Sequence, residues 1–153
     1  MTVVDGLHAF AQVLTAGRIP YAIKPFFFGA TVCALRKPDN SLRPIAVGNV
    51  FRRLISKTIS SALRERAATL LSPNQLGVGI RGGAEAAVHS ARHLSHCTNE
   101  EGLIKLDFRN AFNTLKRNAI INSVHDNLPE IEHYVYASNG STSYLFFGDQ
   151  LLY

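Results

Sequence analysis

The spacing of apolar residues predicts a helix at the start of the chain and a β-hairpin after it. Apolar side chains recur at intervals of three and four over 3–16, and Gly17 is placed to end that helix. Residues 27–36 and 42–47 have the composition of strands, and the turn-forming run 37–41 separates them. We therefore expect an antiparallel hairpin with basic side chains on both sides of its tip.

A long helix is expected next, over about 50–71, with Asn49 as its N-cap. One broad face of this helix is apolar. Arg53, Lys57 and Arg64 fall within about 40° of one another on a different face. This basic stripe fits contacts with a nucleic-acid backbone, and it fits an ordinary solvated face equally well.

The second half of the chain has a less regular order of expected helices and strands than the first half. The expected elements are a glycine-rich crossing at 75–83, a helix at 84–96, a polar connection at 99–102, a central strand at 103–108, helices at 115–127 and 130–137, and a strand at 143–147. The order of strands and helices predicts an α+β fold. A partner strand begins at Leu151, so we expect the sequence to be truncated at Tyr153, because a strand cut short leaves an unpaired edge.

Composition narrows the class of protein. The 153 residues are 46% hydrophobic and 18% charged, which is typical of a folded domain. The net charge is +5, and residues 36–66 hold eight basic residues against two acidic ones. Such a concentration is typical of a phosphate-facing surface. Neither a membrane span nor a secretory signal is visible, so we expect an intracellular protein, in cytoplasm or nucleus, with no membrane partner.

Asp107 is the candidate for catalytic chemistry, because it falls at the end of the expected central strand. A buried carboxylate needs a metal ion or a cationic partner to offset its desolvation. A single aspartate at this place also fits a turn or a helix cap, and the residue pattern alone leaves both interpretations open.

Three motifs, in this order along the chain, resemble reverse transcriptases of the non-LTR retrotransposon type. Residues 34–45, which include Arg43-Pro44-Ile45, resemble the fingers hairpin, and 75–83 with the following helix resemble the segment before the palm. Leu106-Asp107-Phe108-Arg109-Asn110-Ala111-Phe112 resembles the first catalytic motif. The resemblance implies fingers over about 1–100 and the first part of a palm over about 101–153.

The resemblance also implies a set of site residues. Asp107, with the backbone carbonyl of Phe108, would bind the two Mg²⁺ ions of nucleotidyl transfer in the full-length parent. Phe112 would lie under the sugar of the incoming dNTP and exclude a 2′-hydroxyl. Arg43 and Lys37 would bind the triphosphate, and Arg53, Lys57 and Arg64 would contact an RNA or DNA template-primer.

The later Gln-Gly and aromatic-x-Asp-Asp motifs of reverse transcriptases are absent from the 153 residues, so we expect this chain alone not to extend a primer. Two other functions are consistent with the sequence: a nucleic-acid-binding module without catalysis, and a non-functional remnant of a retroelement. His89, His93, His96 and Cys97 lie too close together for a common zinc site, and Phe26, Phe27 and Phe28 are assigned to the core in preference to base stacking.

Overall fold

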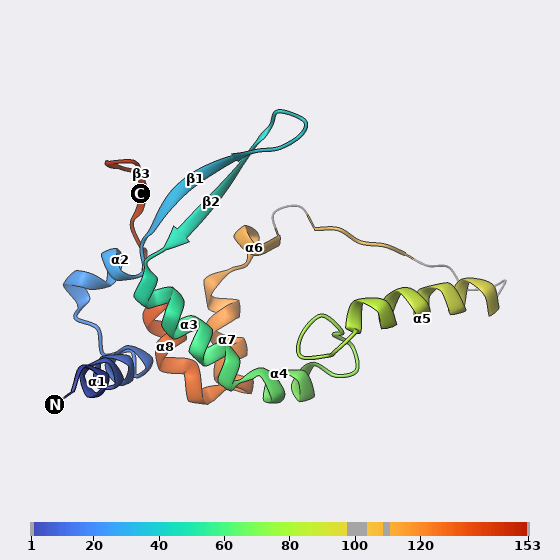
Figure 1. The fold of residues 1–153 in the computed structure, drawn as a ribbon, viewed down its shortest axis with the longest axis horizontal. Helices are drawn as coiled ribbons and strands as arrows, with labels where there is room; N and C mark the ends of the chain where they lie inside the picture. Colours follow the sequence, from blue (N-terminus) through green and yellow to red (C-terminus); the bar gives the residue numbers. More distant parts are fainter. Residues whose placement is uncertain (1, 98–103, 109–110, 153) are drawn as a thin grey trace. The chain divides into compact units, whose positions relative to one another are not determined.

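The computed structural model describes residues 2–97, 104–108 and 111–152 (Figure 1). In chain order its elements are α1 (Val3–Thr15), η1 (Tyr21–Ile23), α2 (Lys24–Phe27), β1 (Ala30–Arg36), β2 (Leu42–Gly48), α3 (Val50–Ala62), α4 (Arg64–Leu71), α5 (Gly83–Cys97), α6 (Ala111–Thr114), α7 (Arg117–Asn127), η2 (Pro129–Ile131), α8 (Glu132–Asn139), β3 (Leu145–Phe147) and β4 (Gln150–Leu151). Helices and one four-stranded sheet together confirm the predicted α+β class. The division into fingers and palm stays a prediction.

The chain forms two compact units. The first combines 1–59 with 116–153, and the second is 60–115. The first unit holds the whole sheet, the second holds α4, α5 and α6, and α3 crosses the boundary. Among the described residues, no helix has both the length and the apolar character needed to cross a membrane.

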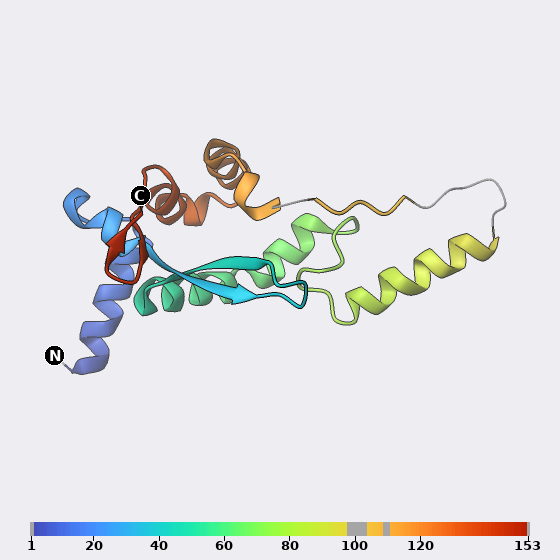
Figure 2. The ribbon, with the colours of Figure 1, turned by 90° about the horizontal axis from the view of Figure 1, so that it is seen from above.

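The sheet of the first unit has the strand order β2-β1-β3-β4. β1 and β2 form the predicted antiparallel hairpin, with Ala30 opposite Gly48 and Arg36 opposite Leu42. β3 pairs with β1 in parallel, next to the base of the hairpin, where Thr31 lies opposite Phe146 (Figures 1 and 2). The hairpin is thus attached to the last strands of the chain only at its base, and its distal part has water on both faces.

The core of the first unit is small and centres on Phe28. Its buried residues are Leu14, Ile19, Phe28, Ile55, Tyr134 and Ala137. They come from α1, α3, α8 and the segments before β1, so the core joins the helices to the point where the hairpin begins. Phe28 is 2% exposed, and its ring meets those of Phe27 and Tyr134 edge-on, at centroid distances of 5.2 and 6.1 Å. Such aromatic pairs add to the stability that burial provides.

Two glycines allow backbone segments of this unit to approach closely. Gly17 has φ +67°, and a Cβ there would stand 2.5 Å from the carbonyl oxygen of His133. Gly29 lies just before β1, and a Cβ there would stand 2.8 Å from the carbonyl oxygen of Tyr144. Any larger residue would push these segments apart. Glycine therefore permits α1 to meet α8, and β1 to meet the segment that leads into β3.

In the second unit, the glycine-rich crossing packs on the chain itself. A Cβ on Gly79, which has φ +71°, would stand 2.5 Å from the Ala68 Cβ of α4. A Cβ on Gly83 would overlap the Leu76 carbonyl oxygen. Gly79 and Gly83 thus allow a close approach between two parts of the protein, which explains these two glycines without a nucleic acid.

The predicted strand at 103–108 is wrong for the residues that the structure describes there. Residues 104–108 are irregular, and Ile104 and Leu106 are 81% and 72% exposed. No described strand pairs with this segment, and a strand without a partner has no ladder to satisfy its backbone. The expected connection at 99–102 lies outside the described residues.

Two other boundaries differ from the prediction. Phe27 belongs to α2, and strand β1 begins only at Ala30, after Phe28 has entered the core. The helix expected at 50–71 is interrupted at Leu63. The interruption follows Thr58-Ile59-Ser60-Ser61, a run of weak helix formers whose β-branched and hydroxyl side chains disfavour a regular helix.

Candidate nucleic-acid interface

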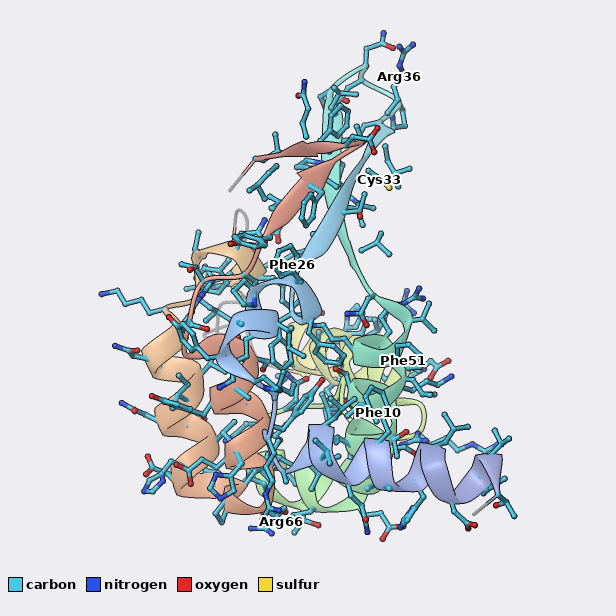
Figure 3. All side chains as sticks on the ribbon, turned by 90° about the vertical axis from the view of Figure 1, so that its left-hand side faces the viewer. Phe10, Phe26, Cys33, Arg36, Phe51 and Arg66 are labelled. Atoms are coloured by element: carbon cyan, nitrogen blue, oxygen red, sulfur yellow. The ribbon has the colours of Figure 1, made fainter. Side chains whose placement is uncertain are left out.

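The hairpin tip is a compact turn that presents basic side chains. The Lys37 amide donates to the Ser41 carbonyl at 2.8 Å, and the Asn40 amide donates to the Lys37 carbonyl at 3.0 Å. Asn40 adopts the left-handed conformation, with φ 61°, which asparagine tolerates better than most residues. Arg36 lies at the end of β1, at the tip in Figure 3, and Arg43 follows on β2.

Asp39 is the one acidic residue in the turn 37–41, and Ser41 donates hydrogen bonds to its carboxylate. The hydroxyl and the amide of Ser41 both donate to Asp39 Oδ1, at 2.7 and 3.0 Å. These hydrogen bonds, the hydroxyl's first, lower the pKa of the Asp39 carboxyl. The carboxylate therefore holds the turn in shape. Arg36 and Arg43 are exposed beside it, and Lys37 is partly buried.

A groove of about 720 Å³ lies between the base of the hairpin and α3. We call it the α3 groove. Its lining residues are Ala30, Ala46, Gly48, Val50, Arg52, Arg53, Leu54, Ser56 and Lys57. The hairpin contributes small side chains and α3 contributes three cations, while no acidic residue of the described chain lines it. The arrangement suits a ligand that carries negative charge along one side.

A second groove, of about 480 Å³, lies beside the base of the hairpin. We call it the β3 groove. Side chains alternate between the faces of a strand, so Thr31 and Cys33 point away from the Ala30 face, as do their cross-strand partners Val47 and Ile45. Thr31, Cys33 and Val47 line the β3 groove, with Phe146 and Arg53 at its sides. The residues that line both grooves are Ala30, Gly48, Val50 and Arg53.

Aromatic rings form a row beside the β3 groove. Phe26 and Tyr144 meet edge-on with centroids 4.7 Å apart, and Tyr144 and Phe146 do so at 6.2 Å. Phe26 is 59% exposed, whereas Phe28 is buried. The assignment of the phenylalanine run to the core is confirmed for Phe28 and Phe27 and is wrong for Phe26, since α2 turns that ring outward (Figure 3).

The structure brings together part of the predicted basic stripe. Arg53 and Lys57 are exposed, occupy one face of α3 one turn apart, and line the α3 groove. Arg64 is the first residue of α4, in the second unit, so the three cations do not share one continuous helix. Arg52 does not belong to the stripe and is half-buried.

The residues of the catalytic resemblance lie in the second unit. Asp107 is exposed in the irregular segment 104–108, and Phe108 is 73% exposed. Phe112 is in the short helix α6 and is 93% exposed. Within the described residues, no three His, Cys, Asp or Glu side chains lie close enough to hold a metal ion. Asp107 thus offers one carboxylate, a donor set that does not fit a pair of Mg²⁺ ions.

The histidines of α5 form no metal site in the described part of the chain. The side chain of Cys97 lies outside the described residues. Cys33 is a free thiol on the exposed face of β1, part-way along the hairpin (Figure 3).

The sequence did not predict the two grooves. Ala30, Ala46 and Gly48 have no polar side chain that would mark a site, and only the strand register brings them together.

The chain is similar to a protein of a retrotransposable element. The chain is 34% identical over 95 residues to the Retrotransposable element SLACS 132 kDa protein of Trypanosoma brucei gambiense. The match covers 62% of this chain and 8% of that protein. No protein-family model matches the chain. No solved structure matches it either. The similarity supports a retroelement origin.

Proposed function

We propose that this chain is the nucleic-acid-binding front part of a retroelement reverse transcriptase, an RNA-directed DNA polymerase. The observation that carries the proposal is the basic surface of the first unit. The hairpin tip presents cations, and the α3 groove presents cations beside the small residues Ala30, Ala46 and Gly48. Residues 36–57 hold six basic residues and one acidic residue. The retroelement similarity supports the choice of nucleic acid over other anionic ligands.

The size of the hairpin fits a short length of nucleic acid. Each of its strands has seven residues and so spans roughly 20 Å, the length of about six stacked nucleotides. Arg36, Lys37 and Arg43 would contact phosphates at the tip, and Arg53 and Lys57 would contact them at the base. In the intact polymerase, Arg43 and Lys37 would instead bind the dNTP triphosphate during synthesis.

The catalytic part of the proposal is carried by the sequence motif at 106–112. Asp107 would be a ligand of the two Mg²⁺ ions together with the Phe108 carbonyl, and Phe112 would select against a 2′-hydroxyl. Asp107 is one carboxylate where two Mg²⁺ ions need several. We therefore expect the 153-residue chain to bind a primer-template and to leave the primer unextended.

Binding of a fluorescein-labelled 20-nucleotide RNA, followed by anisotropy at several salt concentrations, tests the proposal. Each phosphate contact to a single strand contributes about 0.7 to the slope of log K against log salt. The double variant Arg53→Gln/Lys57→Gln should therefore lower the slope by about 1.4, and affinity at about 0.1 M salt by roughly 25-fold.

The matched control removes the same charge from other elements of the first unit. Arg18 follows α1 and Lys116 precedes α7, and both are exposed. Arg18→Gln/Lys116→Gln should keep the wild-type slope to within about 0.3. Equal losses in the two double variants would mean that net charge alone attracts RNA, and the α3 groove would then have no role in binding.

A further inference from the structure

Two polar side chains at the start of α3 reach back to the residues that lead into β1. The Asn49 side-chain amide donates to the Phe27 carbonyl at 2.5 Å, and Arg52 Nη1 donates to the Phe28 carbonyl at 2.6 Å. Asn49 Oδ1 also accepts the Arg52 amide at 2.8 Å, as a helix N-cap does. One short segment thus satisfies two carbonyls and caps its own helix.

These hydrogen bonds join the two ends of the hairpin. The chain enters β1 just after Phe28 and leaves β2 at Gly48, so Asn49 and Arg52 connect the outgoing strand to the returning one. The Arg52 guanidinium lies 5.9 Å from the centroid of the Phe28 ring. A Cβ on Gly48 would stand 3.3 Å from Arg52 Cδ, so the arginine stem crosses the end of β2.

The next turn of α3 is fixed to the core. The hydroxyls of Ser56 and Tyr134 are 2.7 Å apart, which joins α3 to α8. Tyr134 is buried and meets Phe28 edge-on. The hairpin base, α3 and α8 therefore share one connected set of contacts, while the rest of the hairpin has few contacts with the helices.

We propose that Asn49 and Arg52 form a clamp that sets the angle between the hairpin and α3, and with it the width of the α3 groove. The inference rests on the proposed function, because it makes Arg52 a positioning residue for RNA bound through Arg53 and Lys57. The two adjacent arginines thus have different roles. Arg52 uses its planar fork on a carbonyl and a ring, and Arg53 presents a charge to solvent.

The test compares the same conservative substitution at the two neighbours, in the full 153-residue chain. Arg52→Lys keeps the charge but loses the planar fork, and it should weaken binding of the 20-nucleotide RNA about fivefold, the size of one net hydrogen bond, with an unchanged salt slope. Arg53→Lys keeps a phosphate-binding cation and should stay within about twofold of wild type. Asn49→Ser keeps the cap, loses the bond to Phe27, and should weaken binding as Arg52→Lys does.

The competing roles predict different results. If Arg52 contacted phosphate itself, Arg52→Lys would bind normally and Arg52→Gln would lower the salt slope by about 0.7, which overturns the clamp. Unchanged affinity in both Arg52→Lys and Arg52→Gln would limit Arg52 to stability and would also overturn it. A thermal unfolding curve of each variant shows whether a loss of affinity follows from loss of fold.

A measurement without ligand separates the clamp from the proposed function. In hydrogen exchange read by mass spectrometry, Arg52→Lys should speed exchange of amides in β1 and β2 and leave α7 and α8 unchanged. If wild type binds no RNA, the proposed function fails, and this exchange pattern still decides whether the clamp holds the hairpin. Hairpin exchange at the wild-type rate would overturn the clamp.

Discussion

The phenylalanine run 26–28 allows the same substitution to be compared at neighbouring positions with opposite environments. Phe28 is 2% exposed and contacts Phe27, Tyr134 and the Arg52 guanidinium. Phe26 is 59% exposed, and its ring meets that of Tyr144 edge-on. Phe28→Ala and Phe26→Ala remove identical atoms, so the difference between them measures what the core contributes.

The stability that each alanine variant loses follows from how deeply its phenylalanine is buried. Phe28→Ala leaves a cavity in a core of six buried residues and should lower the free energy of unfolding by ~3–5 kcal/mol. About two-fifths of the Phe26 side chain is buried, and Phe26→Ala loses that burial, which contributes ~1 kcal/mol to stability. It also loses the edge-on contact with Tyr144, which contributes ~0.5–1 kcal/mol. The expected gap between the two variants is therefore ~2–3 kcal/mol.

Tyrosine fluorescence during urea unfolding is the assay, because it reports on the first unit alone. The chain has five tyrosines and no tryptophan, and every tyrosine lies outside 60–115. If Phe28→Ala is unfolded in buffer, Phe28→Leu replaces it, with an expected loss of ~1–2 kcal/mol. Equal destabilisation of the two alanine variants, within about 0.5 kcal/mol, would refute the placement of Phe28 at the centre of the core.

Two further outcomes are expected from the backbone of the first unit. Gly17→Ala should lower the free energy of unfolding by more than ~2 kcal/mol in the same urea assay, because left-handed strain of ~1–2 kcal/mol is joined by a clash with the His133 carbonyl. Gly148 has φ +56° but open space around it, so Gly148→Ala should lower the free energy of unfolding by only ~1 kcal/mol. Equal losses in the two variants would contradict the close approach of α1 to α8. At the start of α1, hydrogen bonds with the backbone and then the side chain of Thr2 lower the pKa of Asp5. The capping box therefore stabilises α1 above the unfolded-state pKa of Asp5 and is lost as pH falls through the folded-state value; an NMR titration midpoint for Asp5 at or above 3.8 would contradict this.

Local patterns predicted the elements whose partners are close in the chain. The hairpin followed from two apolar runs around Lys37-Pro38-Asp39-Asn40-Ser41, because that turn brings its own flanks together. Asn49 was recognised as a cap for the same reason, since a cap acts within three residues. The strand expected at 143–147 and its partner strand near Leu151 followed likewise.

Patterns failed where the outcome depends on distant partners. An apolar run such as 104–108 signals a buried strand only if another strand lies beside it, and the described residues supply none. The parallel pairing of β1 with β3 has no local signal at all. At the candidate interface, charge and helical spacing identified Arg53 and Lys57 and placed Arg52 off their face. Only the fold shows that the Arg52 side chain binds a carbonyl at the hairpin base.

The pairing of Thr31 with Phe146 also has a consequence for protein synthesis. A ribosome that adds about 5–20 residues per second completes β1 roughly 6–20 s before it reaches β3. During that interval the β1 edge has its amides and carbonyls uncovered, and such an edge can pair with another nascent chain. Slower synthesis at a lower growth temperature lengthens the interval during which this edge of β1 is uncovered.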